Sequence, residues 1–211
     1  MTLIMCQKRL RRKSIWTTKM DDRILFRCGR IGIMLATLVL SSSFLIAQSR
    51  SDYILVKNRY SNYDYAYSVR IPKGLTGSRS PSPFPNHGFG IELSDQPQAS
   101  ISVDASYNAA EWRSFDDAIK AHKNIFKREV GSEVKIVARV PTVLGKLRAV
   151  RFTMTSNTPE VREVLLAFRK APGEVGIVYE IVLTTVPSRY VKDKHLIVDL
   201  QRTWKMNSLP K

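Results

Sequence analysis

Val164-Leu-Leu-Ala-Phe168 and Gly176-Ile-Val-Tyr-Glu-Ile-Val-Leu183 are the two stretches of sequence that decide the fold. Both are short apolar runs, and the turn-forming pair Pro172-Gly173 separates them. A strand whose residues are apolar at every position must be covered on both of its faces. The two stretches therefore predict central strands of a sheet, with further elements packed on both sides of it.

The segments around these two runs predict more strands, which are half buried. Apolar and polar residues alternate in them, and turn formers such as Pro72, Pro97 and Pro159 separate one from the next. With the two central strands included, the expected strands cover residues 65–71, 89–93, 99–105, 134–140, 147–156, 162–170 and 175–186. The sequence predicts a mainly antiparallel sheet of about six or seven strands.

Two amphipathic helices are available to cover that sheet. Ser114-Phe-Asp-Asp117 resembles a capping box with Asp in place of the usual Glu, and apolar residues then recur at helical spacing to about Glu129, before Gly131. Pro187-Ser188 opens a second helix, in which Ile197, Leu200 and Trp204 share one side. The expected fold class is α+β, a sheet flanked by helices.

The N-terminal segment has the organisation of an export signal. A basic region over residues 1–30 precedes the uncharged run 31–47, and Ala47 before Gln48 is a plausible cleavage site. An uncleaved membrane anchor over 31–47 is the alternative, a buried core helix is a third interpretation, and Met20 is an alternative start. Because the bases precede the apolar run, both export interpretations place a single domain, residues 48–211, outside the cytoplasm.

Charge and cysteine content narrow the class of protein further. Nine bases and two acids precede Gln48, leaving +7 there, and the 25 bases and 16 acids that follow leave +9. The excess of bases favours anionic partners. Cys6 and Cys28 are the only cysteines and both precede Gln48, so the domain over residues 48–211 has no disulfide framework. Its roughly 160 residues can bury enough surface to be stable without one.

Tyr60-Ser-Asn-Tyr-Asp-Tyr-Ala-Tyr-Ser-Val-Arg-Ile-Pro-Lys-Gly-Leu75, an aromatic-rich strand that runs into Ile-Pro, resembles the opening of PsbP-like domains. The C-terminal helix expected over residues 188–205, with Leu200 and Trp204, resembles the element that closes those domains. The resemblance covers about residues 53–206. It implies an antiparallel sheet with flanking helices and a non-enzymatic extracytoplasmic module that binds or stabilises a membrane-associated assembly. It carries no site residues.

The candidate binding surface combines a long loop with basic residues. The loop over residues 72–88, which contains Phe84 and His87, has no periodic pattern, and long loops are often functional. The bases are Lys120, Lys123 and Lys127 on the first helix, and Arg148 and Arg151 on a strand. We expect these residues to contact an anionic envelope component, such as lipid headgroups or a polymer, or a partner protein.

Chemistry beyond binding has little support in the sequence. His87, His122 and His195 lack the spacing of zinc ligands, no phosphate-binding glycine loop occurs, and no cofactor is expected. We expect His122 to be a core or boundary residue and His195 to be exposed. The alternative to a binding module is an extracytoplasmic hydrolase, in which His87 would pair with Asp104 or Glu92 beside Ser100 or Ser102. Export argues against nucleic acid as the partner. The sequence therefore predicts an exported, non-catalytic, basic module, periplasmic, secreted or anchored.

Overall fold

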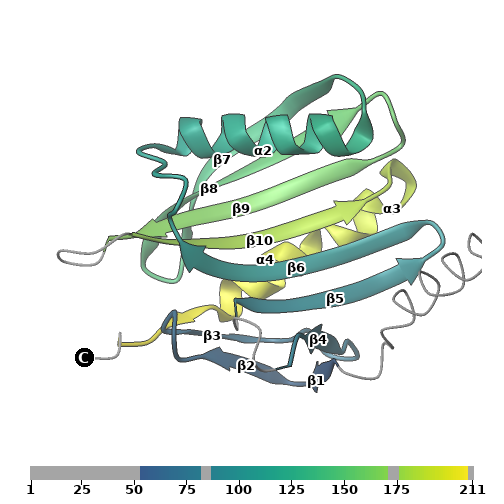
Figure 1. The fold of residues 1–211 in the computed structure, drawn as a ribbon. Coiled ribbons are helices and arrows are strands. Elements are labelled where there is room, and N and C mark those ends of the chain that lie inside the picture. Colours follow the sequence, from purple (N-terminus) through teal and green to yellow (C-terminus); the bar gives the residue numbers. More distant parts are fainter. Residues whose placement is uncertain (1–52, 82–86, 171–175, 209–211) are drawn as a thin grey trace, which may run out of the picture. The chain divides into compact units, whose positions relative to one another are not determined.

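The computed structural model of the protein describes residues 53–81, 87–170 and 176–208 (Figure 1). The predicted leader over residues 1–47, and Phe84, lie outside these ranges. Contacts divide the chain into two units, residues 1–49 and 50–211, and every described residue belongs to the second unit. Within the described part of the chain, no helix has both the length and the apolar character that crossing a membrane requires.

An eight-stranded antiparallel sheet forms the centre of the domain. Its order is β1 (Ile54–Val56), β4 (Gly77–Arg79), β5 (Gly88–Asp95), β6 (Gln98–Tyr107), β10 (Ile177–Thr185), β9 (Val161–Arg169), β8 (Leu147–Ser156) and β7 (Val134–Leu144). A second sheet joins β11 (Lys205–Met206), β3 (Tyr67–Arg70) and β2 (Arg59–Asn62). The antiparallel arrangement is confirmed, but the expected number of strands is too low, because β1, β2, β4 and β11 have only two to four residues each.

β9 and β10 lie in the middle of the large sheet, as their apolar runs predict. β10 pairs with β6 on one side and with β9 on the other. Its side chains alternate between two cores, with Ile181 and Leu183 in one and Val178 in the other. All the described residues of both cores belong to the second unit, and we expect residues 50–211 to fold without the N-terminal segment.

Helix α2 (Phe115–Val130) covers one of the two faces, and its predicted capping residues are confirmed. The Ser114 hydroxyl accepts a hydrogen bond from the Asp117 backbone N–H, and the Asp117 carboxylate accepts one from the Ser114 backbone N–H. Gly131 ends the helix at φ 63°, a left-handed conformation that glycine adopts without strain. Phe126 is fully buried against the sheet, in the core that also contains Phe152 and Val164.

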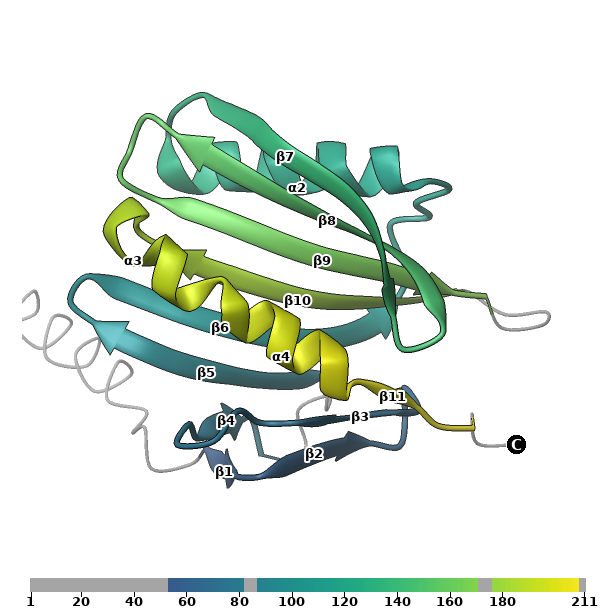
Figure 2. The same ribbon diagram turned by 180° about the vertical axis from the view of Figure 1, so that it is seen from behind.

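The opposite face is covered by α3 (Pro187–Asp193) and α4 (His195–Thr203), which crosses the sheet in Figure 2. The single helix expected over residues 188–205 is therefore wrong in two respects. It is divided at Lys194, and it ends at Thr203, because Trp204 takes an extended conformation and the chain continues into β11. Ile197 and Leu200 are buried as expected.

The aromatic-rich segment that begins at Tyr60 forms β2, a turn and β3 instead of one strand from Tyr65. Tyr60 and Tyr67 belong to the same core as Tyr179 and Trp204. The hydroxyl of Tyr179 donates a 2.8 Å hydrogen bond to the carbonyl oxygen of Tyr65. The small sheet is thus attached to β10 through buried aromatic side chains. The loop predicted over residues 72–88 contains strand β4 and ends at the start of β5.

Candidate functional site

Helix α2 covers only part of its face of the large sheet. In Figure 1 it lies over the half formed by β7, β8 and β9, whereas none of the described helices covers β5 and β6 on this side. The register pairs Gly88 with Asp104, Gly90 with Ser102, and Asp104 with Glu180. Their neighbours Ile101 and Val103 point into the opposite core. We call the open face the residues Gly88, Gly90, Ser100, Ser102, Asp104 and Glu180.

The two glycines of the open face have different roles. A Cβ atom on Gly88 would lie 1.8 Å from the carbonyl oxygen of Val103, so the close approach of β5 to β6 requires glycine there. A Cβ on Gly90 would meet its nearest atom, the carbonyl oxygen of Ile101, at 3.9 Å, which is an ordinary contact. The protein's own packing therefore does not require glycine at position 90, and the missing side chain leaves the face open.

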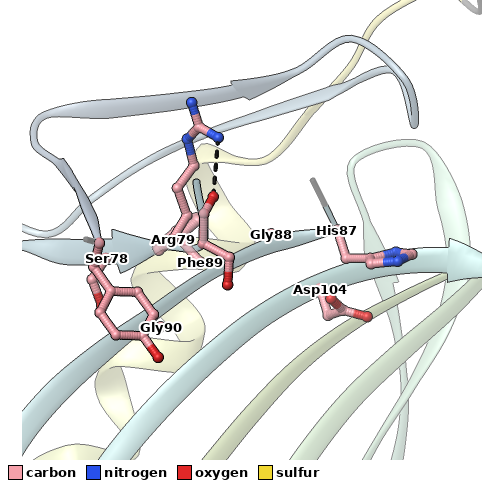
Figure 3. Close-up of a pocket in the computed structure, with 9 residues that line it drawn as sticks. Ser78, Arg79, His87, Gly88, Phe89, Gly90 and Asp104 are labelled. Atoms are coloured by element: carbon pink, nitrogen blue, oxygen red, sulfur yellow. Dashed lines mark hydrogen bonds between the residues drawn. The ribbon is translucent and has the colours of Figure 1, made fainter. Parts of the chain in front are cut away.

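A pocket of about 430 Å³ lies where the open face meets β4. Figure 3 shows Ser78 and Arg79 of β4 toward one end of this pocket and His87 and Asp104 toward the other. Arg79 donates a 3.4 Å hydrogen bond to the carbonyl oxygen of Ser80, which orients the guanidinium. The lining thus offers a cation, a carboxylate and several hydroxyl groups to an occupant, as a site for a polar ligand would.

The imidazole of His87 is held by groups outside the proposed hydrolase arrangement. Its Nδ1 atom lies 2.9 Å from the carbonyl oxygen of Ala105 and 3.1 Å from the hydroxyl of Tyr65, and the ring stacks on that of Tyr65. Because a carbonyl oxygen can only accept, Nδ1 donates to Ala105. Within the described ranges, His87 forms no hydrogen bond to a carboxylate or a serine, so the Ser-His-acid geometry of a hydrolase is not assembled there.

Two carboxylates meet in the middle of the open face. Glu180 accepts a hydrogen bond from Nε2 of His122 at 3.1 Å, and both side chains are largely buried. Burial raises the pKa of Asp104 above its ordinary value; His87 opposes that shift, whereas Glu180 adds to it. The face therefore has an acidic centre in a domain whose net charge is strongly positive. His122 is buried, in agreement with the expected core or boundary position, and His195 is exposed, as expected.

Of the seven predicted binding residues, Phe84 lies outside the described ranges, and the six others do not share one surface. Lys120, Lys123 and Lys127 lie along α2, and Lys127 is paired with Glu133. Arg148 has the strand parity of Val150 and Phe152, which places it on the α2 face of the sheet. Arg151 points to the other face, where its Nε lies 3.3 Å from a Glu163 carboxylate oxygen.

His87 lies at the β5 end of the sheet, distant in strand order from β7 and β8.

The open face was not predicted from the sequence. The pattern that indicates it is present in β5 and β6, where Gly88, Gly90, Ser100 and Ser102 occupy the positions that alternate with apolar ones. In an ordinary half-exposed strand those positions carry larger polar side chains. Among the described residues, no group of three His, Cys, Asp or Glu side chains is arranged to hold a metal ion.

Comparison with known proteins addresses the fold. No family model matches the sequence, and no curated protein matches it. The solution structure of cyanobacterial PsbP from Synechocystis sp. PCC 6803 matches at a TM-score of 0.52 and 13% identity, over 72% of this chain and 92% of that chain. LpqN of Mycobacterium tuberculosis, involved in cell envelope biogenesis, matches at a TM-score of 0.49 and 10% identity, over 75% and 94% of the two chains.

The Ran-binding protein Mog1p of Saccharomyces cerevisiae matches at a TM-score of 0.48 and 13% identity, over 72% of this chain and 96% of that chain. The resemblance that Tyr60–Leu75 and the C-terminal helix suggest is thus confirmed for the fold: the domain is a PsbP-like α+β sandwich, a mainly antiparallel sheet flanked by helices.

Proposed function

We propose that this domain is an exported, non-catalytic binding module that holds a segment of a partner protein against its open face. The observation that carries the proposal is the glycine at position 90, beside serines at positions 100 and 102. A sheet face of this size is normally covered by a helix or by its own large side chains. Here the small residues let a second chain approach the strands closely.

The charge of the open face indicates what that segment carries. Asp104 and Glu180 lie opposite each other, and among the described residues His122 forms an ion pair with Glu180 but not with Asp104. A lysine or arginine side chain placed between the carboxylates would relieve their repulsion, and charge-assisted hydrogen bonds of this kind are stronger than neutral ones. The hydroxyl groups of Ser100 and Ser102 can bind the backbone of the segment beside it.

Site-specific photo-cross-linking tests this proposal in the native host. A photoreactive amino acid replaces the exposed Ser102 in otherwise unchanged full-length protein, and a second version carries it at the exposed Ser188 of α3. We expect position 102 to yield a discrete cross-linked protein that position 188 does not yield. We also expect the product to disappear in a Gly90→Leu background, because the leucine side chain would occupy the face.

The Gly90→Leu variant is informative because position 90 has room for a side chain, so its fold should persist. Its thermal unfolding should match that of the wild-type protein. The proposal is wrong if position 102 gives the same products as position 188, or if Gly90→Leu leaves the product of position 102 unchanged.

Export is the second component of the proposal, and the basic region followed by the apolar run 31–47 supports it. Fractionation of the host, followed by intact-mass measurement, tests it. A soluble envelope form that begins near Gln48 would support a released module. A membrane form that retains residues 31–47 would support an anchored one. Full-length protein in the cytoplasmic fraction would contradict export.

A further inference from the structure

A second surface, separate from the open face, lies at the other edge of the large sheet. β7 is the last strand in the order, so one side of it pairs with β8 and the other has no strand beside it among the described residues. Several apolar side chains of this strand are exposed. Ile136 is 41% exposed, Val137 58% and Val143 55%. Large apolar groups that cluster on one exposed element mark an interaction site more often than scattered ones do.

Basic side chains of α2 lie beside this strand. Asp116, Lys120, Lys123 and Lys127 follow one another at intervals of four, three and four residues, so they form one stripe along the helix. Both ends of the stripe are held toward β7. Asp116 pairs with Arg139 of β7 at 2.6 Å, and Lys127 pairs with Glu133, which precedes β7. Lys120 and Lys123 therefore lie between these ion pairs, on the side of α2 that faces the sheet edge.

Arg148 extends the basic character to the end of the β7–β8 hairpin. It is paired in register with Val143, and the two residues share the α2 face of the sheet. Lys120, Lys123 and Arg148 form no ion pair with any residue in the described ranges. We call the β7 edge surface the residues Lys120, Lys123, Ile136, Val137, Val143 and Arg148.

The edge of β7 is poorly suited to pairing with another strand. A bulge interrupts its register between Ile136 and Ala138, and Pro141 lacks a backbone N–H. Bulges and prolines are the devices by which edge strands avoid adding a further strand. A second copy of the domain would also bring its own bases to the same edge. An occupant of this surface must therefore recognise side chains, apolar and cationic, instead of backbone groups.

We propose that the β7 edge surface docks on a membrane that contains anionic phospholipid. Exposed cations beside exposed apolar side chains match a layer of phosphate headgroups over acyl chains, because electrostatic attraction and apolar burial add. In this arrangement Lys120, Lys123 and Arg148 contact lipid phosphates. Ile136 and Val143, which pair with Met154 and Arg148 and so point to the α2 face, enter the apolar boundary beneath them. The export signal at residues 31–47 would deliver the domain to a membrane surface.

Vesicle co-sedimentation tests this proposal with residues 50–211, so that the apolar leader does not contribute; circular dichroism first verifies that this segment folds. The probes are vesicles of phosphatidylglycerol mixed with phosphatidylcholine, and vesicles of phosphatidylcholine alone. We expect binding to the mixed vesicles and little to the neutral ones. The triple variant Lys120→Gln/Lys123→Gln/Arg148→Gln should weaken binding to the mixed vesicles roughly 100-fold, at about fivefold for each base.

A control variant with the same charge change separates this surface from net charge. Lys57, Lys73 and Lys192 are exposed bases outside the β7 edge surface, and their replacement by Gln should weaken binding less than tenfold. Equal losses in the two triple variants, equal binding to both kinds of vesicle, or no binding to the mixed vesicles would each overturn the proposal. All variants should first show the wild-type melting temperature.

The apolar residues distinguish a membrane from a soluble anionic polymer. Ile136→Ser/Val143→Ser should weaken binding to the mixed vesicles several-fold, whereas Val191→Ser, at the 73% exposed Val191 of α3, should have no effect. If this double variant binds as the wild-type protein does, recognition is electrostatic only and a polyanion replaces the membrane as occupant. Gly90→Leu should leave vesicle binding unchanged, so this result is independent of the open face.

Discussion

Trp204 stacks on Tyr67 with the ring centroids 4.4 Å apart and the ring planes 1° from parallel. Tyr67 lies in β3, near the start of the domain, and Trp204 follows the last turn of α4, near its end. The same indole meets Tyr179 of β10 edge to face. Because these rings come from three distant parts of the chain, their packing joins the small sheet, the last helix and the large sheet. This aromatic contact therefore links the N-terminal part of the domain to its C-terminal part.

Loss of this indole should therefore destabilise the whole domain. Trp204 is only 4% exposed, and truncation of a buried Trp costs about 3–5 kcal/mol of unfolding free energy, a large share of a typical domain's stability. We expect Trp204→Ala to lower the urea midpoint, followed by circular dichroism, by a corresponding amount. Tyr63→Ala, at a 79% exposed ring, is the control and should change it little. Similar midpoints for the two variants would contradict the assignment.

The two glycines of the open face should respond differently to the same change. Gly88→Ala places a methyl group 1.8 Å from the Val103 carbonyl oxygen, so the strands must separate, and we expect a loss of about 3 kcal/mol. Gly90→Ala has room and should leave stability unchanged or raise it by about 0.5 kcal/mol, because alanine restricts the unfolded chain. Thermal unfolding of the two variants measures both. Equal losses would show that position 90 is also sterically closed.

Asp104 should make stability depend on pH. Its pKa is raised in the folded state, mainly by burial, so folding favours the protonated carboxyl. Its contribution is therefore most favourable below the ordinary carboxyl pKa of about 4 and is lost as pH rises through the raised value. Asp104→Asn removes a carboxylate that lies opposite Glu180, and we expect it to stabilise the domain at pH 7 by up to about 1 kcal/mol. At pH 3 the gain should vanish.

Urea unfolding of Asp104→Asn and the wild-type protein at the two pH values makes this measurement. Ser102→Ala, on the same strand and face, is a suitable control because it changes no charge. A stabilisation of the same size at both pH values would contradict an origin in the carboxylate charge. If the gain at pH 7 is observed, the open face retains Asp104 at the expense of stability, which is common at binding sites.

The N-terminus of α2 offers a local test of the capping box. Ser114→Ala removes the hydroxyl that accepts from the Asp117 N–H, and loss of such a cap costs about 1 kcal/mol. Ser114→Asp should keep most of the stability, because aspartate caps helices as well as serine does. Urea midpoints compare the two variants. If Ser114→Asp loses as much as Ser114→Ala, the hydroxyl acts through another contact.

Much of this fold follows from local sequence pattern. The residues 164–168 and 176–183 are apolar on both faces, and β9 and β10 do lie in the middle of the sheet between two cores. Ser114, Asp117 and Gly131 mark the ends of α2, because capping depends on groups within one turn of the helix. The antiparallel arrangement and the PsbP-like fold follow from the same patterns.

Other elements have no local signal. β1, β4 and β11 contain two or three residues, too few for a period, and they are strands only because a partner strand lies beside them. Similarly, the chain leaves the helical conformation after Thr203 because the Trp204 ring packs against the ring of Tyr67, a residue more than a hundred positions earlier in the sequence. Such contacts depend on the assembled core and not on the residues that flank them.

The sequence by itself determined the central strands, the amphipathic faces of the helices and the excess of positive charge, because each depends on residues close together in the chain. Only the tertiary structure decided which side chains share a surface. It placed Arg151 beside the buried Glu163, on the face opposite to α2, and it brought Asp104 opposite Glu180. The physical reason is that strand register, which the whole sheet fixes together, sets the neighbours of every side chain on its faces.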